Sequence, residues 1–279
     1  MRAKPKGQSW HDWLYNAAPD FGRVPTDLAQ TNANADTLFV TGKTASFDRL
    51  TSLKALRRLQ VRELAQDQLD LIGKLNHLTE LRVFGFRGES AAALAKLTKL
   101  EVLTFEWAPK VETLDWLAGL KALRALTLGD LKRVTDFAPI SKLAQLNFLY
   151  ICGGATKKQA IASIAPLAHL KKLEELSLFA EVPGDDIRPL AAMTWLKRLN
   201  IANNFPVETF AELATRLKKT QCEAFAPTRT FKMGGETYID LIGKPYRRFA
   251  KGDPKAKAAI AKRTAEFAHW RAHFESKKS

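Results

Sequence analysis

Apolar residues recur along the chain in a repeating motif, Leu-x-x-Leu-x-apolar, whose copies are separated by polar residues. Successive copies are 21 to 27 residues apart. The alternation at the end of each motif predicts a strand with one buried face. Leucines three residues apart before it predict a short helical or 3₁₀ turn. The second leucines of the motif, with a partial first copy at Leu38, are Leu38, Leu59, Leu81, Leu103, Leu126, Leu149, Leu176 and Leu199.

A unit this short cannot bury an apolar face alone, but stacked units share a continuous core. We therefore predict an α/β fold in which residues 36–217 form a right-handed solenoid of about eight units. A parallel β-sheet would line its concave face, and short helical or 3₁₀ turns its convex face. At about 4.8 Å per strand, the sheet would be roughly 35–40 Å long.

The run Leu-x-x-Leu-x-x-Leu-x-Leu/Val, followed by segments such as 134–143, resembles the leucine-rich repeat family. The short unit is most similar to the internalin and phosphatase-regulator type, and the resemblance covers about two-thirds of the chain. It implies a recognition surface more than a reaction site. One departure concerns the turn asparagine, which the family usually places three positions after the last strand leucine. Only Asn204 fits, so we expect irregular turns. The other units carry Leu64, Phe86, Ala108, Leu131, Gly154 and Glu181 there.

Residues 1–35 precede the repeats and are expected to form an N-terminal cap. Trp10, Trp13, Leu14, Tyr15 and Phe21 are concentrated in this segment. A solenoid end exposes its core and its sheet edge, so we predict that these apolar and aromatic residues cover the first repeat. A ligand-binding aromatic cluster is the alternative.

Residues 218–279 lose the repeat and are expected to form a C-terminal cap. Residues 237–242 read as a strand, residues 243–245 as a turn, and a helix is expected to begin near Pro254. Ile260, Phe267, Trp270 and Phe274 form one apolar stripe on that helix. The segment is similar to the C-terminal extension of a group of bacterial leucine-rich-repeat proteins, a resemblance that implies no activity.

The longest step, 27 residues between Leu149 and Leu176, contains an insertion. Gly153 and Gly154 should break the strand, and residues 156–164 are expected to form a longer helix on the convex side. Such an insertion is either a functional loop or tolerated length variation.

The formal net charge of +15 favours an acidic partner, nucleic acid or an anionic membrane surface. Residues 244–279 alone carry +8, with eleven Lys/Arg against three Asp/Glu. Two cysteines, Cys152 and Cys222, do not make a disulfide framework. The sequence shows no secretory signal and no window of 18 apolar residues, so we expect a cytoplasmic protein without a membrane span.

Side chains that flank the buried strand leucines should face the concave surface. Aromatic residues beside arginine are typical of binding hot spots, so this face is the predicted site for an unidentified protein partner. The alternative is that loops, the cap or the C-terminal segment bury the aromatic side chains. The predicted partner-binding residues are Arg58, Arg82, Phe84, Glu106, Trp107, Phe148, Tyr150 and Phe179.

The basic tail supports a second hypothesis, binding of nucleic acid or an anionic surface. The competing interpretation, which we favour, is a capping helix whose aromatic stripe packs on the last repeat. The candidate anion-binding residues are Arg247, Arg248, Lys251, Lys255, Lys262 and Arg263.

Residue patterns for catalysis are weak. His269 and His273 are four residues apart on the expected helix, but no nearby cysteine or glutamate completes a zinc motif. Gly234-Gly235 lacks the Gly-Lys-Ser/Thr ending of a phosphate loop. We therefore predict no enzymatic activity, no cofactor and no metal site.

Overall fold

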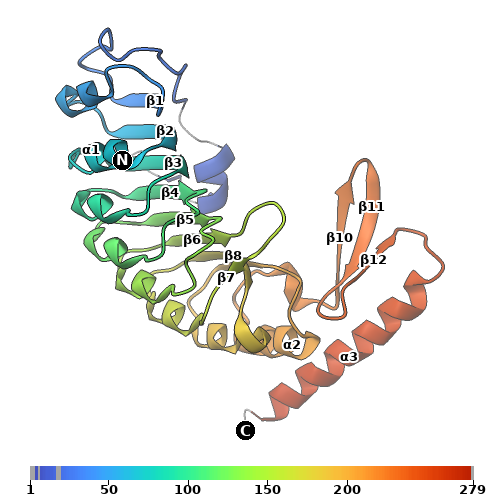
Figure 1. Ribbon diagram of the computed structural model, residues 1–279. Coiled ribbons are helices and arrows are strands. Elements are labelled where there is room, and N and C mark those ends of the chain that lie inside the picture. Colours follow the sequence, from blue (N-terminus) through green and yellow to red (C-terminus); the bar gives the residue numbers. More distant parts are fainter. Residues whose placement is uncertain (1–3, 6, 17–19, 278–279) are drawn as a thin grey trace.

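The computed structural model describes residues 4–5, 7–16 and 20–277, which form a curved solenoid followed by a C-terminal arm (Figure 1). The motif leucines are Cα partners from strand to strand, Leu59 beside Leu81 and so on to Leu199. The predicted parallel sheet is thereby confirmed. Its strands are β1 (Thr37–Thr41), β2 (Arg58–Leu64), β3 (Glu80–Phe86), β4 (Val102–Glu106), β5 (Ala125–Gly129), β6 (Phe148–Cys152), β8 (Glu175–Glu181) and β9 (Arg198–Ile201).

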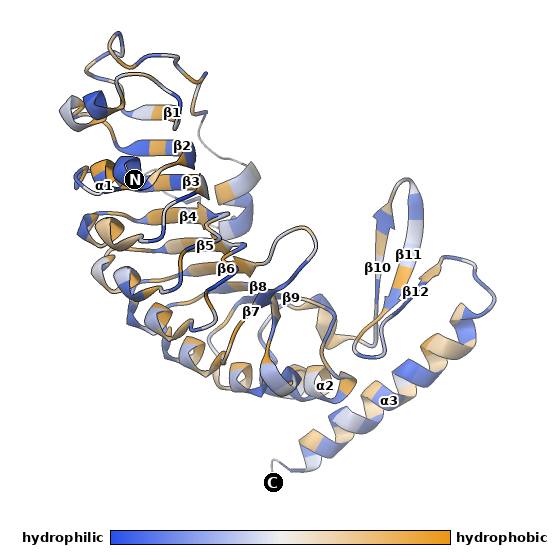
Figure 2. Cartoon of the chain, in the orientation of Figure 1, coloured by the Kyte–Doolittle hydropathy of each residue, from blue (hydrophilic) through white to orange (hydrophobic). Residues whose placement is uncertain are grey.

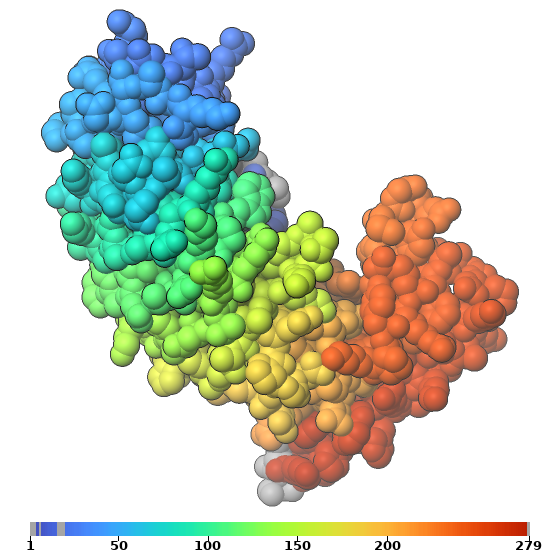
Figure 3. All heavy atoms as spheres, in the orientation of Figure 1, coloured from blue at the N-terminus to red at the C-terminus, as the bar shows by residue number. Residues whose placement is uncertain are grey.

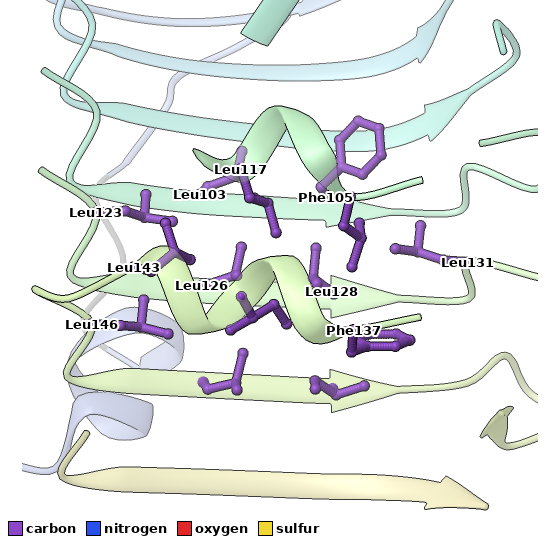
Figure 4. Close-up of a cluster of buried hydrophobic side chains, with 14 of the residues drawn as sticks. Leu103, Phe105, Leu117, Leu123, Leu126, Leu128, Leu131, Phe137, Leu143 and Leu146 are labelled. Carbon is purple, nitrogen blue, oxygen red and sulfur yellow. The ribbon is translucent and has the colours of Figure 1, made fainter. Parts of the chain in front are cut away.

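Short helices cover the convex side and turn each unit back toward the next strand. They are η2 (Phe47–Ser52), α1 (Gln66–Ile72), η3 (Ala92–Lys96), η4 (Asp115–Gly119), η5 (Ala138–Lys142), η6 (Ala165–His169), η7 (Pro183–Asp185) and η8 (Arg188–Ala192). All but α1 are 3₁₀ turns. The three-residue leucine spacing predicts these turns except η7, which lies outside it and contains no leucine. Figure 4 shows the result for the middle repeats, where Leu117 and Leu143 lie in one buried cluster with the strand leucines Leu103 and Leu126. The core is therefore a single leucine column shared by all the units.

The turns after β2 to β5 are regular, although they lack the family asparagine. The residue four positions after each motif leucine is left-handed, with φ of 58° at Glu63, 85° at Gly85, 58° at Trp107 and 50° at Asp130. The next residue in each unit is apolar and fully buried, as in Phe86. The expectation of irregular turns is thus wrong for these units, because a left-handed residue makes the turn and an apolar side chain fills the core.

The insertion after β6 does not form the expected helix. Its residues Gln159 and Ala160 form a short strand, β7 (Gln159–Ala160), parallel to the end of β8. The buried Gln159 amide accepts a hydrogen bond from the Leu131 N–H (3.0 Å) and donates to the carbonyls of Leu131 and Val134. A glutamine from the insertion therefore satisfies the turn backbone that an asparagine usually serves.

The N-terminal segment divides between two places. Residues 26–28 cap the first unit: the Leu28 side chain enters the main core, and its N–H donates to the Ala45 carbonyl at 3.1 Å. Residues 10–15 do not cover the first repeat, which corrects the prediction for Trp10 and Trp13. They lie on the concave face of the middle repeats (Figure 1).

The C-terminal arm begins with helix α2 (Val207–Arg216), followed by η9 (Glu223–Phe225). An antiparallel sheet follows, made of β10 (Thr228–Met233), β11 (Glu236–Leu241) and β12 (Arg247–Ala250), and the chain ends in α3 (Ala256–Ser276). Helix α3 alternates between hydrophobic and hydrophilic bands (Figure 2) and packs on α2. Its Phe267 enters the main core and Trp270 packs against it. Within the described ranges, no helix is both long and apolar enough to cross a bilayer.

Candidate recognition surface

The register of the sheet arranges the concave side chains in three rows that cross the strands. The first row, nearest the strands' amino ends, contains Arg58, Glu80, Val102, Ala125, Phe148, Glu175 and Arg198. The second contains Gln60, Arg82, Thr104, Thr127, Tyr150, Ser177 and Asn200. The third contains Arg62, Phe84, Glu106, Gly129, Cys152 and Phe179.

A short helix that begins at Trp10 and continues through η1 (Asp12–Asn16) lies across the first two rows; we call it the N-terminal helix. It contributes Trp10, Trp13 and Leu14, each at most 5% exposed, to an apolar cluster that is separate from the leucine core. The sheet contributes the other half of this cluster, namely Val102, Ala125 and Phe148. The middle of the concave face is therefore covered by the chain itself.

Charged side chains of the sheet hold the two ends of the N-terminal helix. The Glu175 carboxylate accepts hydrogen bonds from the Trp10 N–H, at 2.9 and 3.0 Å. At the other end, the Arg82 guanidinium donates to the Leu14 carbonyl at 3.0 Å and pairs with Glu80 at 2.8 Å. A negative charge at the amino end of a helix and a positive charge at its carboxyl end both stabilise the helix, because each interacts favourably with the helix dipole. The contacts therefore match this helix in polarity as well as in shape.

The helix removes part of the predicted binding patch from solvent. Phe148 is fully buried and Arg82 is 7% exposed, so neither is presented to a partner in this state. Tyr150 is half-buried, and Tyr15 lies beside it with ring centroids 6.3 Å apart. The Tyr15 hydroxyl shares a 2.7 Å hydrogen bond with Thr127, and burial raises its pKa. The prediction of exposed aromatic residues is wrong for Phe148, because the alternative of an intramolecular cover applies.

Arg62 and Phe84 of the third row lie in an aromatic strip that also includes Phe39, which is level with the second row, and Trp107. The Arg62 guanidinium lies 5.2 Å from the Phe39 ring centroid and 6.0 Å from that of Phe84. Phe84 in turn meets Trp107 at 5.8 Å, and Trp107 is 52% exposed. We call Phe39, Arg62, Phe84 and Trp107 the open strip. Phe84 and Trp107 were predicted from the sequence, whereas Phe39 and Arg62 were missing from the predicted patch.

Farther along the third row, the environment is less polar. Burial raises the pKa of the Glu106 carboxyl, and burial together with nearby Glu106 raises that of the Cys152 thiol. Burial also raises the pKa of Tyr150 to about 12, and its ring packs edge-on against Phe179 at 5.8 Å. A thiol held neutral in this way is a poor nucleophile. Arg58, at the edge of the first row, is paired with Asp36 at 2.8 Å.

Comparisons with known proteins place the fold. No family model and no curated protein matches the chain. Among solved structures, an internalin C2 of Listeria monocytogenes matches at 22% identity over 61% of this chain and 71% of that one, with a TM-score of 0.48. A second Listeria monocytogenes internalin matches at 19% identity, over 68% and 60%, with a TM-score of 0.47. A leucine-rich-repeat protein of Leptospira interrogans matches at 16% identity, over 72% and 58%, with a TM-score of 0.51.

The chain has the leucine-rich-repeat fold. The match to the Leptospira protein and the internal register of the leucines agree on this point. The chain spans less than two-thirds of the Leptospira protein and of the second internalin. At these identities the similarity extends to the fold alone.

The basic residues that follow the leucine-rich repeats occupy different environments. Arg247, Lys251, Lys255 and Lys262 are exposed. Arg263 is 4% exposed and donates to the carbonyls of Ile242, Gly243 (2.9 Å) and Pro245 (3.2 Å). Its assignment as an anion-binding residue is therefore wrong, because its guanidinium is used to hold α3 to the turn before β12.

Arg248, whose side chain is 35% exposed, belongs to an ion-pair network centred on the buried carboxylate of Asp240. The Asp240 side chain is fully buried and accepts hydrogen bonds from Arg248 (2.8 Å), Arg229 (3.0 Å) and Tyr246 (2.8 Å). Burial alone would raise the pKa of Asp240, but these hydrogen bonds lower it below its ordinary value. The Arg248 guanidinium also lies 4.6 Å from the Phe231 ring centroid. This network fixes the three-stranded sheet more than it presents free charge.

A cavity of about 370 Å³ with a mixed lining lies where the leucine-rich repeats meet the arm; Arg198, Asn200, Gln221 and Arg229 supply polar groups, and Leu199, Ile201 and Ile242 apolar ones. Figure 3 shows the notch between the solenoid and the orange hairpin of β10 and β11. Burial raises the pKa of Cys222, also in the lining, to about 12. Across the described part of the chain, no group of three or more His, Cys, Asp or Glu residues is arranged to hold a metal ion.

Proposed function

We propose that this protein is a non-enzymatic binding scaffold whose protein partner docks on the open strip of the concave face. The observation that carries the proposal is the Arg62 guanidinium between two aromatic rings, next to the exposed indole of Trp107. Arginine and tryptophan are the residues most enriched at binding hot spots. A repeat array with a large regular surface is well suited to recognition of another protein.

The charge of the strip supports an acidic partner. Among the residues that the structure describes, no carboxylate lies within ion-pairing distance of Arg62. Its positive charge is therefore available to a carboxylate of the partner, in a bidentate contact that arginine makes well. Both cysteines are free, which supports the proposal of a reducing, cytoplasmic location.

The test is affinity capture from the source lysate, followed by quantitative mass spectrometry, with wild type and the double variant Arg62→Glu/Trp107→Ala. We expect the double variant to lose a nuclease-resistant protein partner while keeping its melting temperature, because both side chains are outside the leucine core. Arg133→Glu, an exposed arginine outside the strip, is the matched control. Equal capture of every protein by all three baits would contradict the proposal.

A second candidate is binding of nucleic acid or an anionic surface by the arm, favoured by the exposed side chains of Arg247, Lys251, Lys255 and Lys262. Deleting α3 is a poor test, because Phe267 belongs to the main core. Lys255→Glu/Lys262→Glu changes only exposed charge. If the arm binds nucleic acid, the wild-type affinity should fall steeply with salt and the variant should bind more weakly. Salt-independent or equal binding would remove this candidate.

A further inference from the structure

We infer that the covered part of the concave face is a docking site for a short aromatic helix of a partner protein, and that the N-terminal helix occupies it as an intramolecular competitor. The inference concerns the regulation of the face used in the proposed function, on which it rests for its biological role. Its physical basis is independent, because it depends on contacts within this chain.

The first observation is the composition of the covered rows. The concave side of a solvated sheet normally carries polar side chains. In the first row, however, three adjacent strands present Val102, Ala125 and Phe148, each at most 3% exposed. These residues form an apolar floor that contacts no part of the leucine core cluster. The side chains of the N-terminal helix pack on this floor.

The second observation is that polar groups at both ends of the floor select a helix. Glu175 accepts the N–H groups of Trp10 and His11, and Arg82 donates to the Leu14 carbonyl. Such groups are the unsatisfied donors and acceptors at helix ends. An extended peptide does not present them in this arrangement. The site therefore recognises one short helix in one direction.

The third observation defines the side chains that such a helix needs. Trp10 and Trp13 are three residues apart and pack edge to face, with ring centroids at 5.6 Å. Leu14 completes the apolar side, while His11 and Asp12 face solvent. A partner helix should thus carry two aromatic residues at positions i and i+3, followed by an aliphatic residue at i+4.

Because the N-terminal helix already occupies the site, a partner helix needs a higher affinity or a higher concentration to bind there. A tethered ligand acts at an effective concentration of the order of millimolar, so a free helix must bind more tightly or be present at comparable concentration. Release of the N-terminal helix would also expose Tyr150 and extend the open strip to the first row. The N-terminal helix and the open strip together determine which partner proteins can bind the concave face.

The test uses a fluorescent, end-capped peptide of residues 8–15 and full-length protein, with binding followed by anisotropy. The protein variant Trp10→Ala/Trp13→Ala should release its own helix without disturbing the leucine core. We expect it to bind the peptide at least tenfold more tightly than the wild type does. A peptide carrying the same two substitutions should bind at least tenfold more weakly. Arg133→Ala, at an exposed position outside the N-terminal helix and the apolar floor, is the control in the protein.

Two further variants and one size measurement secure the interpretation. Ala125→Arg, added to the double variant, fills the floor and should abolish peptide binding. If circular dichroism shows that the double variant is not folded, Trp10→Ala alone replaces it. Equal peptide binding by wild type and variant, or none by a folded variant, would overturn the inference. So would a wild-type dimer in light scattering that requires Trp10 and Trp13, because the helix would then be exchanged between copies. The assay does not involve the unknown partner, so this inference and the proposed function can fail separately.

Discussion

Phe148 and Leu149 are adjacent in β6, both fully buried, and lie on opposite sides of the sheet. Leu149 belongs to the leucine core, whereas Phe148 belongs to the separate cluster that the N-terminal helix covers. We expect Leu149→Ala to lower the free energy of unfolding by about 2–5 kcal/mol, the usual cost of a core cavity. Phe148→Ala would cost about 3–5 kcal/mol in a closed core. Here its effect on global unfolding should be smaller than that of Leu149→Ala.

The reason is that the structure can respond to the loss of the Phe148 ring by releasing one helix. The leucine core survives that release, so the loss of global stability cannot exceed the free energy with which the helix docks. The cavity created by Leu149→Ala lies between stacked units, so no single segment can be released to relieve it.

Urea unfolding followed by circular dichroism measures the two losses, and hydrogen exchange locates them. In Phe148→Ala, faster exchange should be confined to residues 10–15; in Leu149→Ala it should spread over neighbouring repeats. The reasoning is refuted if Phe148→Ala costs as much as Leu149→Ala and residues 10–15 remain as protected as in the wild type.

Three further predictions concern buried polar groups. Asp240→Asn should cost about 1–3 kcal/mol at neutral pH. The pKa of Asp240 is lower in the folded protein than in the unfolded chain. The ionised carboxylate therefore adds to the free energy of unfolding above the ordinary pKa, and this stabilisation is lost as pH falls through the folded pKa. Urea unfolding at a series of pH values should show a smaller loss of stability in acid for the variant than for the wild type. Arg263→Met should cost about 1–3 kcal/mol and accelerate exchange in α3, whereas exposed Lys262→Met should not. Gln159→Leu leaves the Leu131 N–H unpaired and should lower the melting temperature, unlike a change at exposed Lys158. An unchanged melting temperature for Gln159→Leu would show that the turn has another donor and acceptor.

The repeats could be predicted from the sequence because their contacts are local and periodic. Each leucine meets the equivalent leucine about 23 residues away, so one motif specifies both strand register and core. The same regularity allowed Phe84 and Trp107 to be placed on the concave face. Which concave residues stay exposed could not be predicted in this way, because that depends on a segment outside the period.

The N-terminal helix is held by contacts between residues far apart in sequence, such as Trp10 and Glu175. No periodic pattern connects these positions. A signal was nevertheless present: Val102 and Ala125 stand where the alternation of strand residues should place polar side chains. Arg263 presents a different problem, since its sequence context resembles that of its exposed basic neighbours. Its burial follows from three carbonyls gathered by the turn at residues 242–245.

The N-terminal helix has a mechanical consequence as well. A solenoid bends easily, because each unit touches only its neighbours and small rotations add along the stack. Glu175 in β8 and Arg82 in β3 are four strand spacings apart, about 19 Å at the usual interval. Because it binds both residues, the N-terminal helix links β3 to β8 across the concave face. Flattening or tightening the arc would stretch or compress those end contacts, so the docked segment should stiffen the middle repeats and hold one curvature.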